Sequence, residues 1–162
     1  MKKQVIFLIA ILNVISCGEV GPTYEQITAI KPISQRIDDI NKTKAELKNS
    51  EDLIALVFEE PLYLEFEYPV RENESYVIKY RFDDSGCYEI KLDTYFNKQD
   101  DTQKVLEAII KDIDVNTTLG APKKELDFYR WENSKMSIEI NTQLIERGII
   151  SITILNNISL TF

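Results

Sequence analysis

The sequence predicts an α+β fold: a mostly antiparallel sheet of about six to seven strands with one helix packed on a face, plus an N-terminal helix. Three observations favour this class. Apolar and polar residues alternate in short segments across residues 62–96 and again across residues 129–162, which is typical of half-buried strands. Residues 105–113 lie between these groups and repeat apolar side chains at helical spacing. Residues 30–47 show the same helical spacing ahead of the first strands.

The predicted N-terminal helix has one apolar stripe along an otherwise charged surface. The stripe residues recur at three- and four-residue spacing, and Lys44 fills one expected position. Two interpretations stay open, because the stripe could pack on its own domain or contact a partner helix. In the second case Ile37 and Ile40 would bind the partner. The stripe consists of Ile30, Ile33, Ile37, Ile40 and Leu47.

The first group of strands is predicted to form two antiparallel hairpins. Residues 53–58 come before them and fit either a helix turn or a strand. A fold-back at Glu72 and a turn at residues 83–86 then place apolar side chains opposite each other on one face. The same turns place opposite charges together on the other face, as a stable antiparallel pair requires. The expected pairs are Leu64 with Tyr80, Glu65 with Lys79, and Arg81 with Glu89.

The helix between the two strand groups is predicted with its start and its buried side. Asp100 or Asp101 is expected to cap its N-terminus through a side-chain oxygen. Ile109 lies at the centre of its apolar stripe, whereas Glu107 and Lys111 lie on the polar side. Because a helical segment precedes each strand group, the chain has the pattern of a weak structural repeat.

The second group of strands is predicted to turn at residues 133–134 and around Ile145. Residues 156–157 are expected to begin a last hairpin, and the face that its final strand covers stays open. The expected pairs are Trp131 with Met136, Tyr129 with Ile138, Ile140 with Ile150, and Ile138 with Ile152.

The first 17 residues have the features of an export signal. Residues 1–3 (Met-Lys-Lys) are positively charged, and residues 5–12 form an apolar run that is too short to span a bilayer. The run is followed by Val14-Ile15-Ser16-Cys17, an aliphatic, a variable, a small residue and a cysteine. This stretch resembles the lipobox of bacterial lipoproteins, although Val and Ile replace the commoner Leu and Ala. An ordinary secretory signal with a chance cysteine is the alternative.

The resemblance implies that Cys17 receives a diacylglycerol and that the chain is cut just before it. We therefore expect a signal peptide at residues 1–16, a lipid anchor and tether at residues 17–22, and a single α+β domain at residues 23–162. Two or three acyl chains would hold the protein stably on a membrane. Gly18 is not the aspartate that retains lipoproteins in the inner membrane of some bacteria, so the outer membrane is favoured.

The charge of the mature chain restricts its partners. Cleavage removes Lys2 and Lys3 from the 19 basic residues, which leaves 17 against 27 acidic residues and a formal charge of −10. A strongly negative chain is unsuited to nucleic acid and to polyanionic ligands. It could attract a basic protein partner, or the charge could serve solubility alone.

The composition also restricts the chemistry. The chain has no histidine, which excludes Ser-His-Asp and Cys-His catalysis and histidine-ligated zinc. Lipidation of Cys17 would leave Cys87 as the single thiol, so no disulfide can form within the chain. The turn at residues 83–86 lacks the alternating oxygen ligands of a calcium loop. The sequence therefore predicts no catalytic, metal or cofactor site.

The sequence predicts a membrane-anchored, non-catalytic binding or adaptor protein of the cell envelope. Its surface for an envelope or secreted protein is expected on the sheet face that carries Tyr63 and Arg81, or on the N-terminal stripe at Ile37 and Ile40. One alternative is an acidic inhibitor or immunity-type protein against a basic toxin or enzyme. A remote alternative is a hydrolase that uses two carboxylates.

Overall fold

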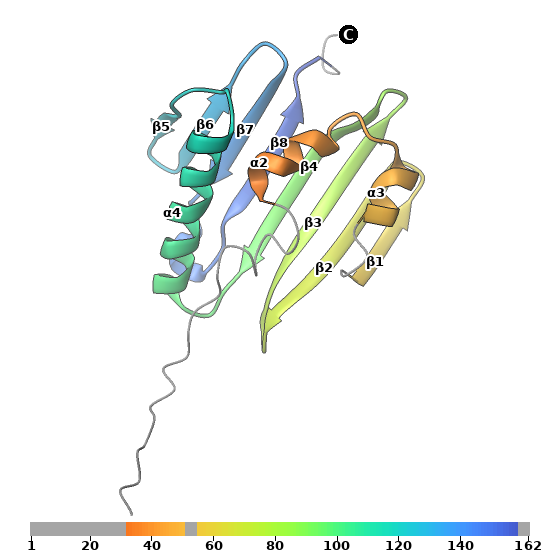
Figure 1. Cartoon of the computed structure of the whole chain (residues 1–162). Helices are drawn as coiled ribbons and strands as arrows, with labels where there is room; N and C mark the ends of the chain where they lie inside the picture. The colour runs from red at the N-terminus through yellow and green to blue at the C-terminus, as the bar shows by residue number, and fades with distance from the viewer. Residues whose placement is uncertain (1–31, 51–54, 159–162) are drawn as a thin grey trace, which may run out of the picture.

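A computed structural model describes residues 32–50 and 55–158 of the chain. The predicted signal peptide, Cys17, the predicted tether and most of the predicted final strand lie outside these residues. The chain has two groups of strands, and a helical segment precedes each group (Figure 1). In chain order the elements are α2 (Ile33–Arg36), the 3-10 helix η1 (Ile37–Asp39), α3 (Lys44–Ser50), β1 (Ala55–Glu60), β2 (Tyr63–Arg71), β3 (Glu74–Asp83), β4 (Gly86–Tyr95), α4 (Gln99–Asn116), β5 (Lys123–Glu125), β6 (Phe128–Glu132), β7 (Met136–Asn141), the 3-10 helix η2 (Ile145–Arg147) and β8 (Ser151–Asn156).

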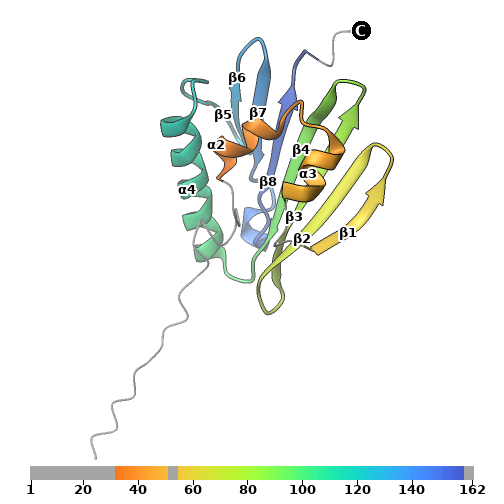
Figure 2. The same cartoon turned by 45° about the vertical axis from the view of Figure 1, so that its right-hand side comes forward.

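The eight strands form one open antiparallel sheet in the order β1-β2-β3-β4-β8-β7-β6-β5. Each half is a four-stranded meander, and the last strands of the halves, β4 and β8, pair at the centre of the sheet. The helices α2, α3 and α4 all lie on one face of this sheet (Figures 1 and 2). The predicted α+β class is therefore confirmed.

The predicted strand number was too low. The ambiguous residues 53–58 overlap strand β1, which the sequence did not decide because an apolar run fits either a strand or a helix turn. Strand β5 was missed because its three residues are all exposed and polar, so they show no alternation. Short edge strands of this kind carry no periodic signal.

The predicted continuous helix over residues 30–47 is wrong, because the structure divides this segment into α2, η1 and α3. Pro32 precedes α2, and Asn41 adopts a left-handed backbone with φ 70°. The amide of Asn41 donates to the carbonyl of Cys87 at 2.8 Å, and the Cys87 amide donates to the carbonyl of Lys42 at 2.8 Å. The chain therefore pairs with the start of β4 instead of continuing the helix.

This pairing explains the glycine that begins β4. Gly86 has φ 116°, which L side chains rarely adopt. A methyl group at Gly86 would lie 2.5 Å from the carbonyl oxygen of Asn41. Glycine is therefore required at position 86 for two reasons. The turn between β3 and β4 needs its positive φ, and the segment at Asn41 leaves no room for a side chain.

The helical stripe nevertheless faces the sheet. Ile33 and Leu47 are fully buried, Ile40 is 9% exposed, and Ile37 is half-buried against the same core. In the part of the chain that the structure describes, the N-terminal stripe therefore packs on its own domain.

The predicted register of the first strand group is confirmed. Strand β2 pairs with β3 so that Leu64 lies opposite Tyr80 and Glu65 lies opposite Lys79. Strand β3 pairs with β4 with Arg81 opposite Glu89. The turn between β3 and β4 is held by the Asp83 carboxylate, which accepts the Ser85 amide at 2.8 Å.

The predicted register of the second strand group is wrong by two residues. The structure pairs Trp131 with Ile138 rather than with Met136, because Asn133 is the first residue of the turn and not a central one. Its side-chain oxygen accepts the amides of Lys135 at 2.8 Å and Met136 at 3.0 Å. A shift of two residues keeps each side chain on its face, so the predicted core residues stay correct.

The hairpin between β7 and β8 shows the same shift. Ile140 lies opposite Ile152 rather than Ile150, and Ile138 lies opposite Ile154. The connection contains η2 and ends at Gly148, which has φ 78°. This 3-10 turn takes up residues that a simple turn would leave in the strands.

Helix α4 begins earlier than predicted. Its N-cap is Lys98, which makes no side-chain capping bond, and Asp100 and Asp101 lie in the first turn. Acidic residues in the first turn still favour the positive end of the helix. The predicted stripe is buried at Val105, Leu106, Ile109 and Ile113, with Ile110 half-buried.

The buried face of α4 predicts a large difference between two substitutions. Ile109→Ala should lower the free energy of unfolding by about 2–4 kcal/mol, because it removes buried methyl groups and leaves a cavity. The matched change Glu107→Ala on the exposed side should cost less than about 1 kcal/mol. Urea denaturation measures both values, and equal losses would contradict the assigned face.

Candidate functional site

The sheet face opposite the helices, called the outer face below, is the candidate site. No helix of residues 32–50 or 55–158 covers it (Figure 2). Adjacent strands bring polar side chains of this face into rows across the sheet, because directly opposed residues point to the same side. One row runs Tyr63, Arg81, Glu89, Leu155, Ser137 and Glu132. The next row runs Phe58, Glu65, Lys79, Lys91, Thr153, Glu139, Arg130 and Lys123.

Asp93 is the hub of the ionic contacts at the centre of the outer face. One of its oxygens accepts Lys79 Nζ at 2.9 Å, and the other accepts the Ser151 hydroxyl at 2.5 Å. Lys91 Nζ lies 3.6 Å from the same carboxylate. Burial opposes ionisation of Asp93, but the bonds from Ser151 and Lys79 outweigh it and hold the pKa below its usual range. Asp93 therefore joins three strands through one carboxylate.

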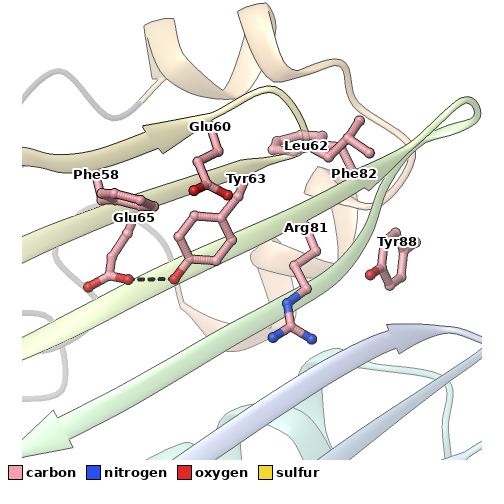
Figure 3. Close-up of a pocket in the computed structure, with 8 residues that line it drawn as sticks. All are labelled: Phe58, Glu60, Leu62, Tyr63, Glu65, Arg81, Phe82 and Tyr88. Atoms are coloured by element: carbon pink, nitrogen blue, oxygen red, sulfur yellow. Dashed lines mark hydrogen bonds between the residues drawn. The ribbon is translucent and has the colours of Figure 1, made fainter.

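A shallow cavity of about 500 Å³ opens on the outer face at the end formed by β1, β2, β3 and β4 (Figure 3). Two β-bulges shape this end, one at Val57 in β1 and one where β3 meets the start of β4. The second bulge adds Tyr88 to the lining beside Arg81. The lining residues are Phe58, Glu60, Leu62, Tyr63, Glu65, Arg81, Phe82 and Tyr88.

Tyr63 stands at the centre of this cavity. Its hydroxyl donates to the carboxylate of Glu65, and its ring meets that of Phe58 edge-on with centroids 5.8 Å apart (Figure 3). Burial, followed by the bond to Glu65, raises the pKa of Tyr63 well above its usual value. Tyr63 therefore stays a protonated hydrogen-bond donor at neutral pH.

Arg81 lies directly opposite Tyr63 and is more than half exposed. Its guanidinium forms an ion pair with Glu89 at 3.2 Å. Its charge is thus balanced by a carboxylate beside the cavity. Exposed pairs of this kind contribute little to stability, so Arg81 remains available to a binding partner.

The structure brings together one of the two predicted binding sets. Tyr63 and Arg81 lie side by side in the cavity, and Glu65, Lys79 and Glu89 surround them as expected. The other set, Ile37 and Ile40, lies on the helix side of the sheet and packs against the core.

Sequence reasoning missed Phe58, Glu60, Leu62, Phe82 and Tyr88 as lining residues. Phe58 and Glu60 depended on recognising β1 as a strand, whereas Leu62 lies in the turn between β1 and β2. Tyr88 depended on the bulge, which adds one residue that strict alternation does not anticipate.

Cys87 is a buried, free cysteine at the start of β4. Cys87 is fully buried, and burial, followed by the charge of Asp39, raises its pKa to about 12. A thiol with this pKa carries almost no thiolate at neutral pH. Within residues 32–50 and 55–158, no three acidic or cysteine side chains come close enough to hold a metal ion.

No family model, no curated protein and no solved structure is significantly similar to this chain. In the part of the chain that the structure describes, no helix is long and apolar enough to cross a membrane.

The contacts of Asp93 predict a pH-dependent contribution to stability. Because its pKa is lowered by folding, the ionised carboxylate stabilises the fold above the unfolded value of about 3.9, and this stabilisation is lost as pH falls through the folded pKa. Asp93→Asn should therefore lower the free energy of unfolding more at pH 7 than at pH 3. Urea denaturation at the two pH values measures this difference.

Ser151→Ala is the matched variant for this measurement. It removes one of the bonds that lower the pKa of Asp93, so it should reduce the difference between pH 7 and pH 3 without abolishing it. A loss for Asp93→Asn that is the same at both pH values would rule out the electrostatic role.

Proposed function

We propose that this chain is a lipid-anchored, non-catalytic binding protein of the bacterial cell envelope, attached through Cys17 and placed in the outer membrane. The anchor rests on the lipobox-like residues 14–17, which lie outside the described residues. The single observation that supports binding is the exposed outer face, which carries charges of both signs in register and a cavity at one end. Mixed charges with aromatic side chains suit a polar protein contact.

Binding without turnover is supported by the chemistry of the side chains. The chain contains no histidine, and Cys87 is buried with a raised pKa. The Glu65 carboxylate in the cavity accepts the Tyr63 hydroxyl. These groups suit recognition better than proton transfer or nucleophilic attack.

A second candidate is an acidic inhibitor of a basic toxin or enzyme. It is favoured by the formal charge of −10 of the mature chain and by the carboxylates of Glu60 and Glu65 in the cavity. Both candidates use the same outer face. Capture of one basic enzyme together with loss of its activity would select the inhibitor.

The anchor predicts a change in membrane association. Cys17→Ser should abolish lipidation, because serine lacks the thiol that receives the diacylglycerol. Intact-mass analysis should show the loss of the acyl chains, and detergent phase partitioning should move the protein to the aqueous phase. An acylated Cys17→Ser protein in the detergent phase would refute the anchor.

The outer face predicts a loss of partner capture. Replacing Tyr63 and Arg81 by Ala should weaken capture of envelope proteins at least about tenfold, since Tyr and Arg dominate protein interfaces. The melting temperature should change little. Affinity capture of the lipidated protein from its own envelope measures the effect.

The matched control is Phe128→Ala with Arg130→Ala at the opposite end of the outer face. This pair removes the same kinds of side chain far from the cavity, so capture should be retained. Equal loss in both double variants would exclude the cavity end as the binding site. Turnover of an envelope substrate by the purified protein would refute the binding function as a whole.

A further inference from the structure

We propose that the cavity at the β1 end of the outer face is the docking site for a basic, extended segment of a partner protein. One Lys or Arg side chain of that segment would enter the cavity, beside the rings of Phe58 and Tyr63 and the carboxylates of Glu60 and Glu65. This inference rests on the proposed function and specifies which part of the outer face binds and what chemistry it recognises.

Apolar side chains are unusually exposed along β1 and its turn to β2, and two of them, Phe58 and Leu62, line the cavity. Leu56 is 38% exposed, Val57 49%, Phe58 49% and Leu62 59%. All four come from β1 and from the turn that joins it to β2. Exposed apolar residues concentrated on one short segment mark an interaction surface more than scattered ones do.

β1 also has an edge available for pairing. Within residues 32–50 and 55–158 it pairs only with β2, so no described strand pairs with its other edge, although the Glu60 carbonyl accepts a bond from Lys44. An extended segment of another protein can add to such an edge as a further strand. The bulge at Val57 turns Phe58 onto the outer face, where it lies opposite Glu65.

The charge of the cavity selects a cation. Within the described residues, no Lys or Arg lies within ion-pair distance of the carboxylates of Glu60 and Glu65. The neighbouring Glu59 points to the helix side, where Lys44 at 2.9 Å and Lys48 at 2.6 Å neutralise it. Glu65 accepts the Tyr63 hydroxyl and lies opposite Lys79, but neither cavity carboxylate has a direct ion-pair partner among the described residues.

The nearest cations of the protein have carboxylate partners other than Glu60 and Glu65. Arg81 pairs with Glu89 at 3.2 Å, and Lys79 pairs with Asp93 at 2.9 Å. A cation from a partner would meet two carboxylates and the aromatic rings of Phe58 and Tyr63. Ring faces attract a cation, and hydrogen bonds to ionised carboxylates are the strong ones.

The experiment uses the full-length lipidated protein in detergent micelles and fluorescein-labelled ten-residue peptides. One peptide alternates Arg with Thr, and its matched control alternates Glu with Thr. Fluorescence anisotropy should show saturable binding of the Arg peptide alone. Binding of the Glu peptide with equal affinity, or no binding of either peptide, would overturn the proposal.

Charge-neutral variants then locate the site. Glu60→Gln with Glu65→Gln should lower the affinity for the Arg peptide by about tenfold or more. The matched pair Glu132→Gln with Glu139→Gln, at the far end of the outer face, should change its affinity little. Equal weakening by both pairs would mean non-specific charge attraction and would overturn the proposal.

The aromatic ring is tested by conservative exchange. Phe58→Leu keeps an apolar side chain without a ring, so it should lower the affinity for the Arg peptide. Phe58→Tyr keeps a ring and should leave this affinity unchanged. Competition by spermidine as effective as by unlabelled peptide would assign the cavity to a small polycation and overturn docking of a protein segment. If only this proposal fails, Tyr63→Ala with Arg81→Ala still weakens capture of the native partner.

Discussion

The pairing of β4 with β8 is the contact on which the rest of the structure depends. These strands end the two four-stranded meanders, and their antiparallel ladder joins both halves into one sheet. On the helix side the ladder aligns Ile90 with Ile154 and Leu92 with Ile152, all buried. Because residues far apart in the chain meet here, the ladder brings the helices from both halves over one continuous apolar surface. Trp131 links the second half to α4 by donating its indole proton to Asp114 at 2.8 Å.

The helices of residues 32–50 and 55–158 lie on one side of the sheet and leave its other side uncovered by helices. The outer face is stabilised there by cross-strand ion pairs rather than by a second apolar layer, with Asp93 joining β3, β4 and β8. Toward the β1 end the ion pairs finish with Arg81 and Glu89, and bulges and exposed apolar residues lie beyond this pair. The physical difference between the two ends of one face is what makes the β1 end the candidate for recognition.

Much of the fold could be predicted from local patterns. Alternation in residues 62–96 placed Tyr63, Arg81 and Glu89 on one face in the correct register, although a bulge at Tyr88 interrupts the pairing of β3 with β4. The buried side of α4 followed from its apolar spacing. The predicted register was wrong where a side chain changed the turn. Asn133 does so because its side-chain oxygen accepts hydrogen bonds from two backbone amides of its own loop. The predicted pairings differ from the observed ones by two residues, so each side chain was still assigned to the correct face of the sheet.

The sequence by itself determined the α+β class, the apolar faces, the charge and the lack of histidine, because these depend on neighbouring residues and on composition alone. Only the tertiary structure decided that Asn41 docks against β4 and breaks the N-terminal helix, and that Ile40 packs inside its own domain. It also decided that Phe58 and Tyr88 line one cavity. These features depend on β-bulges and on contacts between distant segments, whose energies no local pattern of the chain records.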